Sequence, residues 1–201
     1  MPEPPFARYA GLQALIDYLS PSGALGSYND GLLQDSLDEA ESAINDYTRR
    51  QFAGTAGTTY YNRFSQRLVR GQALYLQEDI HTLVSLTNGD TTVIPVGSVW
   101  LEPRNGGPPY RLLRLKSPYV YVWNTDSDVI IAGTFGFSTV PPAAISRATV
   151  ELAAYLYRAK DFSPTQTAGM DAAGEVIYPK GMPDFILDKL KPYRSRSGGV
   201  I

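Results

Sequence analysis

A change in hydrophobic period divides this chain and constrains its fold more than any other feature. Up to about residue 50, apolar residues recur every three or four positions, as they do on one face of a helix. That stripe comprises Leu33, Leu37, Ala40, Ile44 and Tyr47. From Thr58 to Phe137 the pattern alternates, which is the period of a strand. Helical spacing returns after Pro142, so an all-α and an all-β fold are both excluded.

This order of segments predicts an α+β fold, in which a small helical bundle of about four helices carries an inserted antiparallel β-sheet and hairpin region. Helices are expected over 7–19, from the Asn29-Asp30 cap to about 50, from Pro142 onward, and over 183–191. The expected strands are 58–64, 73–77, 82–87, 91–94, 98–101, 111–115, 119–123 and 128–135. Asn88-Gly89-Asp90 predicts a hairpin turn between two of them.

The domain organisation follows from the same pattern. We expect residues 1–161 to form a single helical-bundle domain that includes the β-rich insertion at about 58–137. Residues 162–201 are expected to form an extended, flexible arm that ends in the short C-terminal helix.

The run VIIAGTFGFSTVPPAAIS at 129–146 has no charged residue and could suggest a membrane span. Two glycines and two prolines interrupt it, and such backbone breaks would leave unpaired polar groups in lipid. Its glycines do not form a P-loop, because no Gly-Lys-Ser/Thr follows them. We therefore expect a joint between a strand and a helix, and no membrane partner.

No motif points to catalysis, a cofactor or a metal. The one histidine, His81, has no nucleophile motif to serve. Asn124, Asp126 and Asp128 alternate as in a calcium loop, but Val129 stands where glycine is needed and Phe135 where glutamate is needed. Cysteine is absent, which excludes a disulfide and a thiolate metal site. The sequence therefore predicts a protein that is not an enzyme and has no cofactor.

Charge is nearly balanced, with 18 basic and 20 acidic residues, which argues against a bulk nucleic-acid binder. The second helix has an acidic face that includes Asp35, Asp38 and Glu39; it is either simply solvated or turned toward something specific. Two basic clusters are either solvated surface or contacts for nucleic acid or an acidic partner. They comprise Arg104, Arg111, Arg114 and Lys116, and then Lys189, Lys191, Arg194 and Arg196.

Aromatic residues suggest two uses. The 14 tyrosines suit an oligomer interface, because tyrosine combines a large apolar ring with a polar tip. Tyr119, Tyr121 and Trp123 would share one face of the strand expected at 119–123. An alternative function is therefore a β-rich ligand-binding or hydrolytic domain that uses this aromatic strand face.

Four stretches in this order resemble the head–tail connector family of tailed bacteriophages, also called adaptor or head-completion proteins. They are INDYTRRQF at 44–52, DIHTLVSLTNGDTTVIP at 79–95, GTFGFSTVPPAAISRATVELAAYLYRAKD at 133–161 and MPDFILDKLKPYR at 182–194. They are similar to that family's helix ending, hairpin, strand–proline turn–long helix and C-terminal short helix. The long helix after the sheet favours an adaptor over a stopper or terminator, since those relatives are mostly β.

The resemblance implies a structural virion protein. Members form a homo-oligomeric ring, usually a dodecamer, which joins the capsid portal to the tail or to the next connector protein, such as a stopper. The ring extends the channel through which double-stranded DNA passes without sequence specificity. The implied location is the head–tail junction of the virion, with the host cytoplasm as the site of assembly.

The resemblance also assigns candidate partner-binding residues. In related members the C-terminal segment reaches the portal, and by analogy that role falls to residues 183–201. The candidates there are Phe185, Leu190, Tyr193, Arg194 and Arg196. Asp35, Asp38 and Glu39 are candidates for the channel lining, because like charge would keep DNA from adhering.

Overall fold

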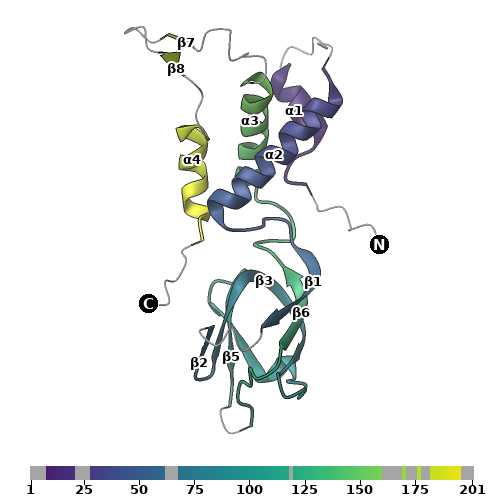
Figure 1. Cartoon of the computed structure of the whole chain (residues 1–201), viewed down its shortest axis with the longest axis vertical. Helices are drawn as coiled ribbons and strands as arrows, with labels where there is room; N and C mark the ends of the chain where they lie inside the picture. Colours follow the sequence, from purple (N-terminus) through teal and green to yellow (C-terminus); the bar gives the residue numbers. More distant parts are fainter. Residues whose placement is uncertain are drawn as a thin grey trace. The chain divides into compact units, whose positions relative to one another are not determined.

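A computed structural model describes residues 8–20, 28–61, 68–117, 120–159, 169–170, 176–177 and 182–195 (Figure 1). The described chain forms two compact units. The helical unit comprises Arg8–Arg49 and Pro142–Ser195, and the β unit comprises Arg50–Pro141. The α+β class expected from the sequence is confirmed, with helices before and after one antiparallel sheet.

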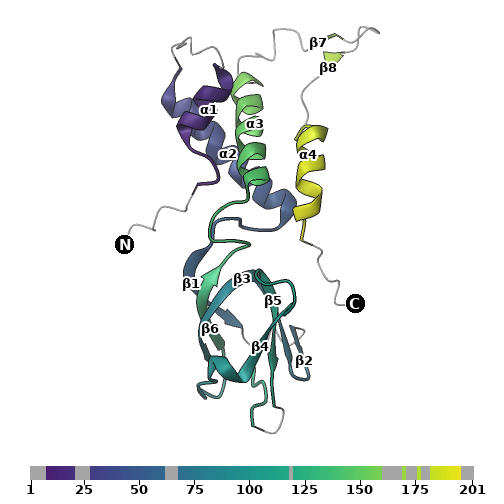
Figure 2. The ribbon, with the colours of Figure 1, turned by 180° about the vertical axis from the view of Figure 1, so that it is seen from behind.

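The helical unit is built around α3 (Ala143–Ala159). Helices α1 (Leu12–Leu19), α2 (Asp30–Thr48) and α4 (Asp184–Leu190) all contact it, and the short 3-10 turn η3 (Lys191–Tyr193) follows α4 (Figure 2). The predicted apolar stripes form its core, because each helix turns its apolar face inward. The fully buried side chains include Leu15, Leu33, Leu37, Ile44, Ile145, Ile186 and Leu190.

The ends of α2 follow their sequence signals. The Asn29 side chain accepts a hydrogen bond from the Leu32 N–H at 3.2 Å, which confirms the predicted N-cap. At the other end Arg49 adopts a left-handed conformation, with a φ of 55°, and its N–H donates to the Asn45 carbonyl at 2.7 Å. A non-glycine residue in this conformation ends the helix sharply at the boundary of the β unit.

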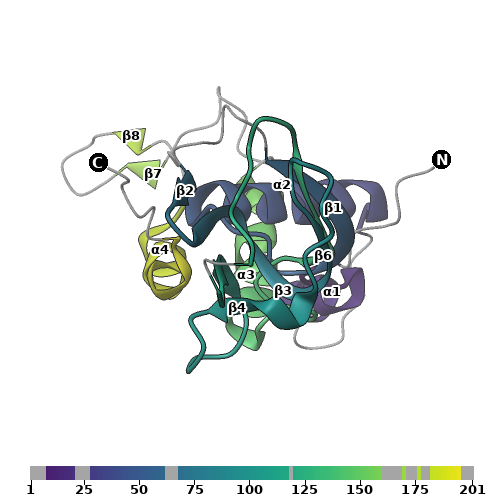
Figure 3. The same cartoon turned by 90° about the horizontal axis from the view of Figure 1, so that it is seen from below.

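The β unit contains one antiparallel sheet in the order β1-β6-β3-β5-β4, with β2 paired to β3. Figure 3 views the strands from below. Its strands are β1 (Thr55–Tyr61), β2 (Val69–Arg70), β3 (Ala73–Thr87), β4 (Val99–Glu102), β5 (Tyr110–Leu115) and β6 (Val129–Phe135). The first half of β3 pairs with β5 and the second half with β6, with register shifts in between. These shifts bend β3 around one core, which includes Leu74, Ile80, Leu86, Leu113, Val129 and Ile131.

The strand prediction differs from the structure in three places. The segments 73–77 and 82–87 form the single strand β3, because its bulges keep the pairing continuous. Segment 91–94 makes only one bridge, between Thr87 and Val93. Residues 120–123 are not a strand, and Tyr119 lies outside the described residues. Trp123 is instead inserted into the core, where its Nε1–H donates to the Gln72 carbonyl at 2.8 Å.

The uncharged run at 129–146 is the expected joint: β6 ends at Phe135 and α3 begins at Ala143. Glycine is required twice in it. A Cβ on Gly133 would lie 2.1 Å from the Thr82 carbonyl oxygen, and Gly136 has a φ of 129°. Pro142 starts α3 as predicted, since its carbonyl accepts from the Ile145 N–H at 2.8 Å. Within the described ranges, none of the helices has the length and apolar character to cross a membrane.

Of the predicted arm at 162–201, most of residues 162–181 lies outside the described residues, as does Arg196. Between 162 and 181 the described residues are the two-residue strands β7 (Gly169–Met170) and β8 (Val176–Ile177), which pair with each other. The predicted short helix at 183–191 is confirmed as α4.

Candidate functional site

The acidic face of α2 is the first candidate surface. Asp35, Asp38 and Glu39 are all exposed, and Asp38 forms an ion pair with Arg8 at 3.1 Å. Both side chains of that ion pair are well exposed, so the pair leaves most of the negative potential of the acidic face in place. Glu41, which sequence reasoning did not separate from this face, is half-buried and accepts from the Tyr9 N–H at 2.7 Å. Burial raises the pKa of Glu41, and the Tyr9 N–H offsets this only in part.

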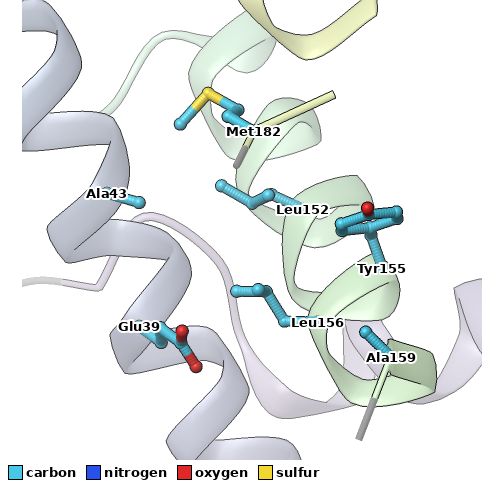
Figure 4. Close-up of a pocket in the computed structure, with 7 residues that line it drawn as sticks. All are labelled: Glu39, Ala43, Leu152, Tyr155, Leu156, Ala159 and Met182. Atoms are coloured by element: carbon cyan, nitrogen blue, oxygen red, sulfur yellow. The ribbon is translucent and has the colours of Figure 1, made fainter. Parts of the chain in front are cut away.

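A groove of about 280 Å³ runs along the same helix, with Glu39 at its edge (Figure 4). Leu152 and Leu156 of α3 point across it toward α2. The remaining lining residues are Ala43, Tyr155, Ala159 and Met182. An apolar groove beside one carboxylate suits an apolar side chain that also carries a cation or a hydrogen-bond donor. The sequence did not reveal it, because its two walls lie more than a hundred residues apart.

The attachment of α4 to α3 depends on one buried carboxylate. Glu151 of α3 forms an ion pair with Lys189 of α4, and a second with Arg147 at 3.0 Å. Burial raises the pKa of Glu151, but the hydrogen bonds from Lys189 and Arg147 outweigh it, and the pKa lies below its ordinary value. Ile186 and Leu190 complete the attachment from the apolar side. Glu151 was missed by sequence reasoning, since it falls within a helix that reads mainly as apolar.

The structure distributes the predicted portal-binding residues unevenly. Phe185 is 52% exposed in the first turn of α4, whereas Leu190 is fully buried in the core of the helical unit. Tyr193 is half-buried, and the exposed Arg194 guanidinium lies 5.6 Å from the centre of the Tyr47 ring. The surface around α4 therefore offers Phe185 and Arg194, while Leu190 anchors the helix from inside.

Two of the four cations in the basic cluster predicted around residues 103–109 are neutralised within the β unit. Arg111 lies 3.0 Å from Asp79, and Arg50 lies 3.0 Å from the other oxygen of the same carboxylate. Arg114 pairs with Glu102 at 2.9 Å. The sequence did not predict that Asp79 would link Arg50 to Arg111, because the three residues come from segments about thirty residues apart.

The two other cations of this cluster surround an exposed tryptophan. The Arg104 guanidinium lies 4.4 Å and the Lys116 ammonium 4.1 Å from the centre of the Trp100 ring. Trp100 is on the edge strand β4, directly opposite Arg114 on β5. This Trp100 cluster (Trp100, Arg104 and Lys116) has the tryptophan and arginine composition that is enriched at protein interfaces.

The aromatic platform expected at 119–123 is not formed. Trp123 is buried, the Tyr121 ring packs partly against the core, and the exposed side chains are Val120 and Val122. This removes the strand face on which the ligand-binding or hydrolytic alternative rested. Asn124 and Asp126 form a turn, in which the Asp126 N–H donates to the Asn124 side chain at 2.9 Å. No group of acidic residues and histidine within the described ranges could hold a metal ion.

Comparison with solved structures shows one consistent fold. A chain from the neck of an empty gene transfer agent (GTA) particle, computed with C6 symmetry, has a TM-score of 0.60 at 17% identity, covering 93% of this chain and 90% of that one. A chain from the virion of the native GTA particle has a TM-score of 0.63 at 17% identity, covering 96% and 94%. The protein has the fold of a particle-neck chain. A chain from the neck of the native GTA particle, computed with C12 symmetry, agrees: its TM-score is 0.54 at 15% identity, covering 94% of each chain.

The neck-chain fold includes both units, because each comparison covers more than nine-tenths of this chain. The β unit is therefore part of the shared fold. By sequence, no known protein family and no curated protein matches the chain.

Proposed function

We propose that this protein is a structural, non-enzymatic component of the neck of a phage-like particle, and resides in the virion. The observation that carries the proposal is the fold similarity to neck and virion chains over almost the whole length of both proteins. A shared fold alone does not define a function. Here the order of sequence motifs, which resembles head–tail connectors, independently suggests the same role.

In this proposal the protein forms a homo-oligomeric ring, a dodecamer, that joins the portal to the tail or to the next connector protein. Support comes from the structures of the GTA particle neck, which were computed with C6 and with C12 symmetry. Exposed aromatic side chains, of the kind that contribute to protein interfaces, are present in both units: Tyr18 in the helical unit, and Tyr60, Tyr75 and Trp100 in the β unit.

The proposed portal contact is the surface around α4 together with the arm. Phe185 offers an exposed aromatic ring, and Tyr193 and Arg194 follow the helix. Arg196 would extend this surface. Leu190 would support this surface from the core, because its side chain is fully buried.

The proposed channel lining is the acidic face of α2, formed by Asp35, Asp38 and Glu39. Carboxylates repel the phosphate backbone, so DNA would pass without being held. Charge reversal of all three to lysine should then hinder DNA passage and reduce infectivity. Reversal of the exposed Asp126, in a turn of the β unit, is the matched control. Unchanged infectivity in the triple variant would remove this assignment.

The decisive test mixes the purified protein with the portal of its own particle and images the mixture by electron microscopy. A ring on the portal is expected. The paired substitutions Phe185→Ala and Arg194→Ala should weaken docking, whereas Val84→Ala, at an exposed apolar residue of β3, should not. Deleting α4 is a poorer test, since it would also remove the buried Ile186 and Leu190. A protein that stays monomeric and ignores the portal would contradict the proposal.

A further inference from the structure

The sequence contains two Asn-Gly pairs, and the structure holds them in opposite environments. They are Asn88-Gly89, in the turn after β3, and Asn105-Gly106, in the loop between β4 and β5. Asn-Gly is chemically labile, because glycine has no side chain to hinder attack of its backbone nitrogen on the preceding asparagine side chain. Since both pairs belong to the β unit, each is an internal control for the other.

Asn88-Gly89 is buried and firmly held. Asn88 is 3% exposed, its Nδ2 donates to the Val122 carbonyl at 2.9 Å, and its Oδ1 accepts from the Asn124 N–H at 2.9 Å. The Gly89 N–H, which would have to attack, donates to the Asn124 carbonyl at 3.1 Å. Closure of a ring at this site would break all three bonds. The glycine is needed here for close packing, since a Cβ would lie 2.4 Å from the Asn124 carbonyl oxygen.

Asn105-Gly106 is exposed and loosely held. Both residues are exposed, and within the described chain no hydrogen bond restrains the Asn105 side chain. The backbone around Gly106 is uncrowded: a Cβ there would meet only the Pro103 Cγ, at 3.6 Å. The next residue, Gly107, has a φ of 64° and open space around it. Among the described residues, neither a hydrogen bond to the Asn105 side chain nor crowding at Gly106 opposes the approach of the Gly106 nitrogen to the Asn105 side chain.

We propose that Asn105 is a site of spontaneous deamidation in the folded protein and that Asn88 is protected. The Gly106 nitrogen attacks Asn105 Cγ, a new C–N bond forms, the Cγ–Nδ2 bond breaks, and ammonia leaves. Solvent water then opens the cyclic succinimide at either carbonyl, which gives aspartate or isoaspartate. One ammonia is lost and one water is gained, and no redox partner is needed.

The product changes the Trp100 cluster. A new carboxylate stands next to Arg104, whose guanidinium lies 4.4 Å from the centre of the Trp100 ring. The net charge of this surface falls by one, and an isoaspartate also lengthens the loop backbone by one bond. Deamidation would therefore alter the surface around the Trp100 cluster as the protein ages.

The test is incubation of the full-length protein at mildly alkaline pH, followed by pepsin digestion in acid, which suppresses further reaction. Mass spectrometry then measures aspartate plus isoaspartate at positions 105 and 88. We expect Asn105 to react at least about a hundredfold faster, because Asn88 can react only in molecules whose turn has opened. In urea, where both pairs are exposed, the two rates should become comparable.

A matched variant keeps the test independent of folding. Gly106→Ala should slow the reaction at position 105 severalfold and leave the fold intact, because the added Cβ has room. Comparable rates at positions 88 and 105 in the folded protein would overturn the proposal. So would the absence of reaction at position 105 in folded protein that reacts there in urea.

Discussion

Each unit holds one buried carboxylate between two cationic side chains, yet the two arrangements differ in where the cations lie. In the β unit, Asp79 lies between Arg50 and Arg111, and the Arg50 side chain is only 14% exposed. In the helical unit, Glu151 lies between Lys189 and Arg147, and the Arg147 side chain is 76% exposed. The carboxylates are alike, so the cations make the difference.

This difference decides what the loss of the carboxylate would cost. Lys189 and Arg147 can be hydrated in place if Glu151 is neutralised. Arg50 cannot, because it is enclosed and also lies 5.1 Å from the centre of the Phe137 ring. A buried charge without its partner is far more costly than an exposed one. The ion pairs of Asp79 are therefore part of the core of the β unit, whereas the ion pair of Glu151 with Lys189 fastens α4 to α3.

The largest expected effect is that of Asp79→Asn. It should reduce the free energy of unfolding of the β unit by about 3 kcal/mol, because the mostly buried Arg50 and the partly exposed Arg111 would both lose the charge of the carboxylate that they contact. Urea unfolding followed by tryptophan fluorescence measures this, since both tryptophans belong to the β unit. Glu102→Gln is the control: Arg114 lies equally close to it, but in solvent, so the loss should stay below about 1 kcal/mol. Equal losses in the two variants would break the comparison.

Glu151→Gln should have a smaller effect, about 1–2 kcal/mol on the helical unit, because Gln keeps the shape and loses the charge-assisted hydrogen bonds. Hydrogen exchange should accelerate mainly in α4. Asp188→Asn removes an exposed ion pair between α4 and Lys191, the first residue of η3, and should change nothing measurable. If α4 exchanged no faster in the Glu151 variant, the proposed attachment through Glu151 would be wrong.

In acid, wild type and Glu151→Gln should have the same free energy of unfolding. The pKa of Glu151 is depressed in the folded protein, so its contribution is complete above its ordinary pKa and is lost as the pH falls through the folded-state value. Urea unfolding followed by circular dichroism, at neutral pH and in acid, reports mainly on the helical unit. A gap between the two proteins that persisted at the lowest pH would contradict this origin.

The smallest expected effect is that of Glu41→Gln on α2, below about 0.5 kcal/mol at neutral pH, because the Gln oxygen can still accept from the Tyr9 N–H. The contribution of Glu41 to the free energy of unfolding depends on pH with the opposite sign to that of Glu151. Burial raises the pKa of Glu41, so the stability associated with its protonated form is present in acid and is lost as the pH rises through the raised value. The same circular dichroism series measures it, and a slope of the Glu151 sign would refute the assignment.

Periodicity predicted the helices well and the strands less well, for a physical reason. A helix satisfies its own backbone, so the stripe from Leu33 to Tyr47 and the cap at Asn29 suffice to define α2. A strand depends on a partner. The alternation at 119–123 therefore suggested a strand, although Trp123 is inserted into the core and no neighbour pairs with residues 120–123 among those described.

The Asn88-Gly89 turn also combines a feature that the sequence predicted with one that only the structure revealed. The sequence predicted a turn at Asn88-Gly89 from local conformation, and the turn is present. The positive φ, however, is at Thr91, at 67°, while Gly89 is required by its approach to the Asn124 backbone. A local signal correctly located the turn, but a contact more than thirty residues away determines why glycine is needed.

By itself the sequence determined the α+β class, the helices, the joint at 129–146 and the lack of catalytic motifs, because these depend on local pattern and composition. Only the tertiary structure decided which charges are neutralised: Asp79 links Arg50 to Arg111, and Glu151 fastens α4. It also decided that Leu190 is buried while Phe185 is exposed. Burial and pairing are properties of residues brought together from distant segments, and no local pattern records them.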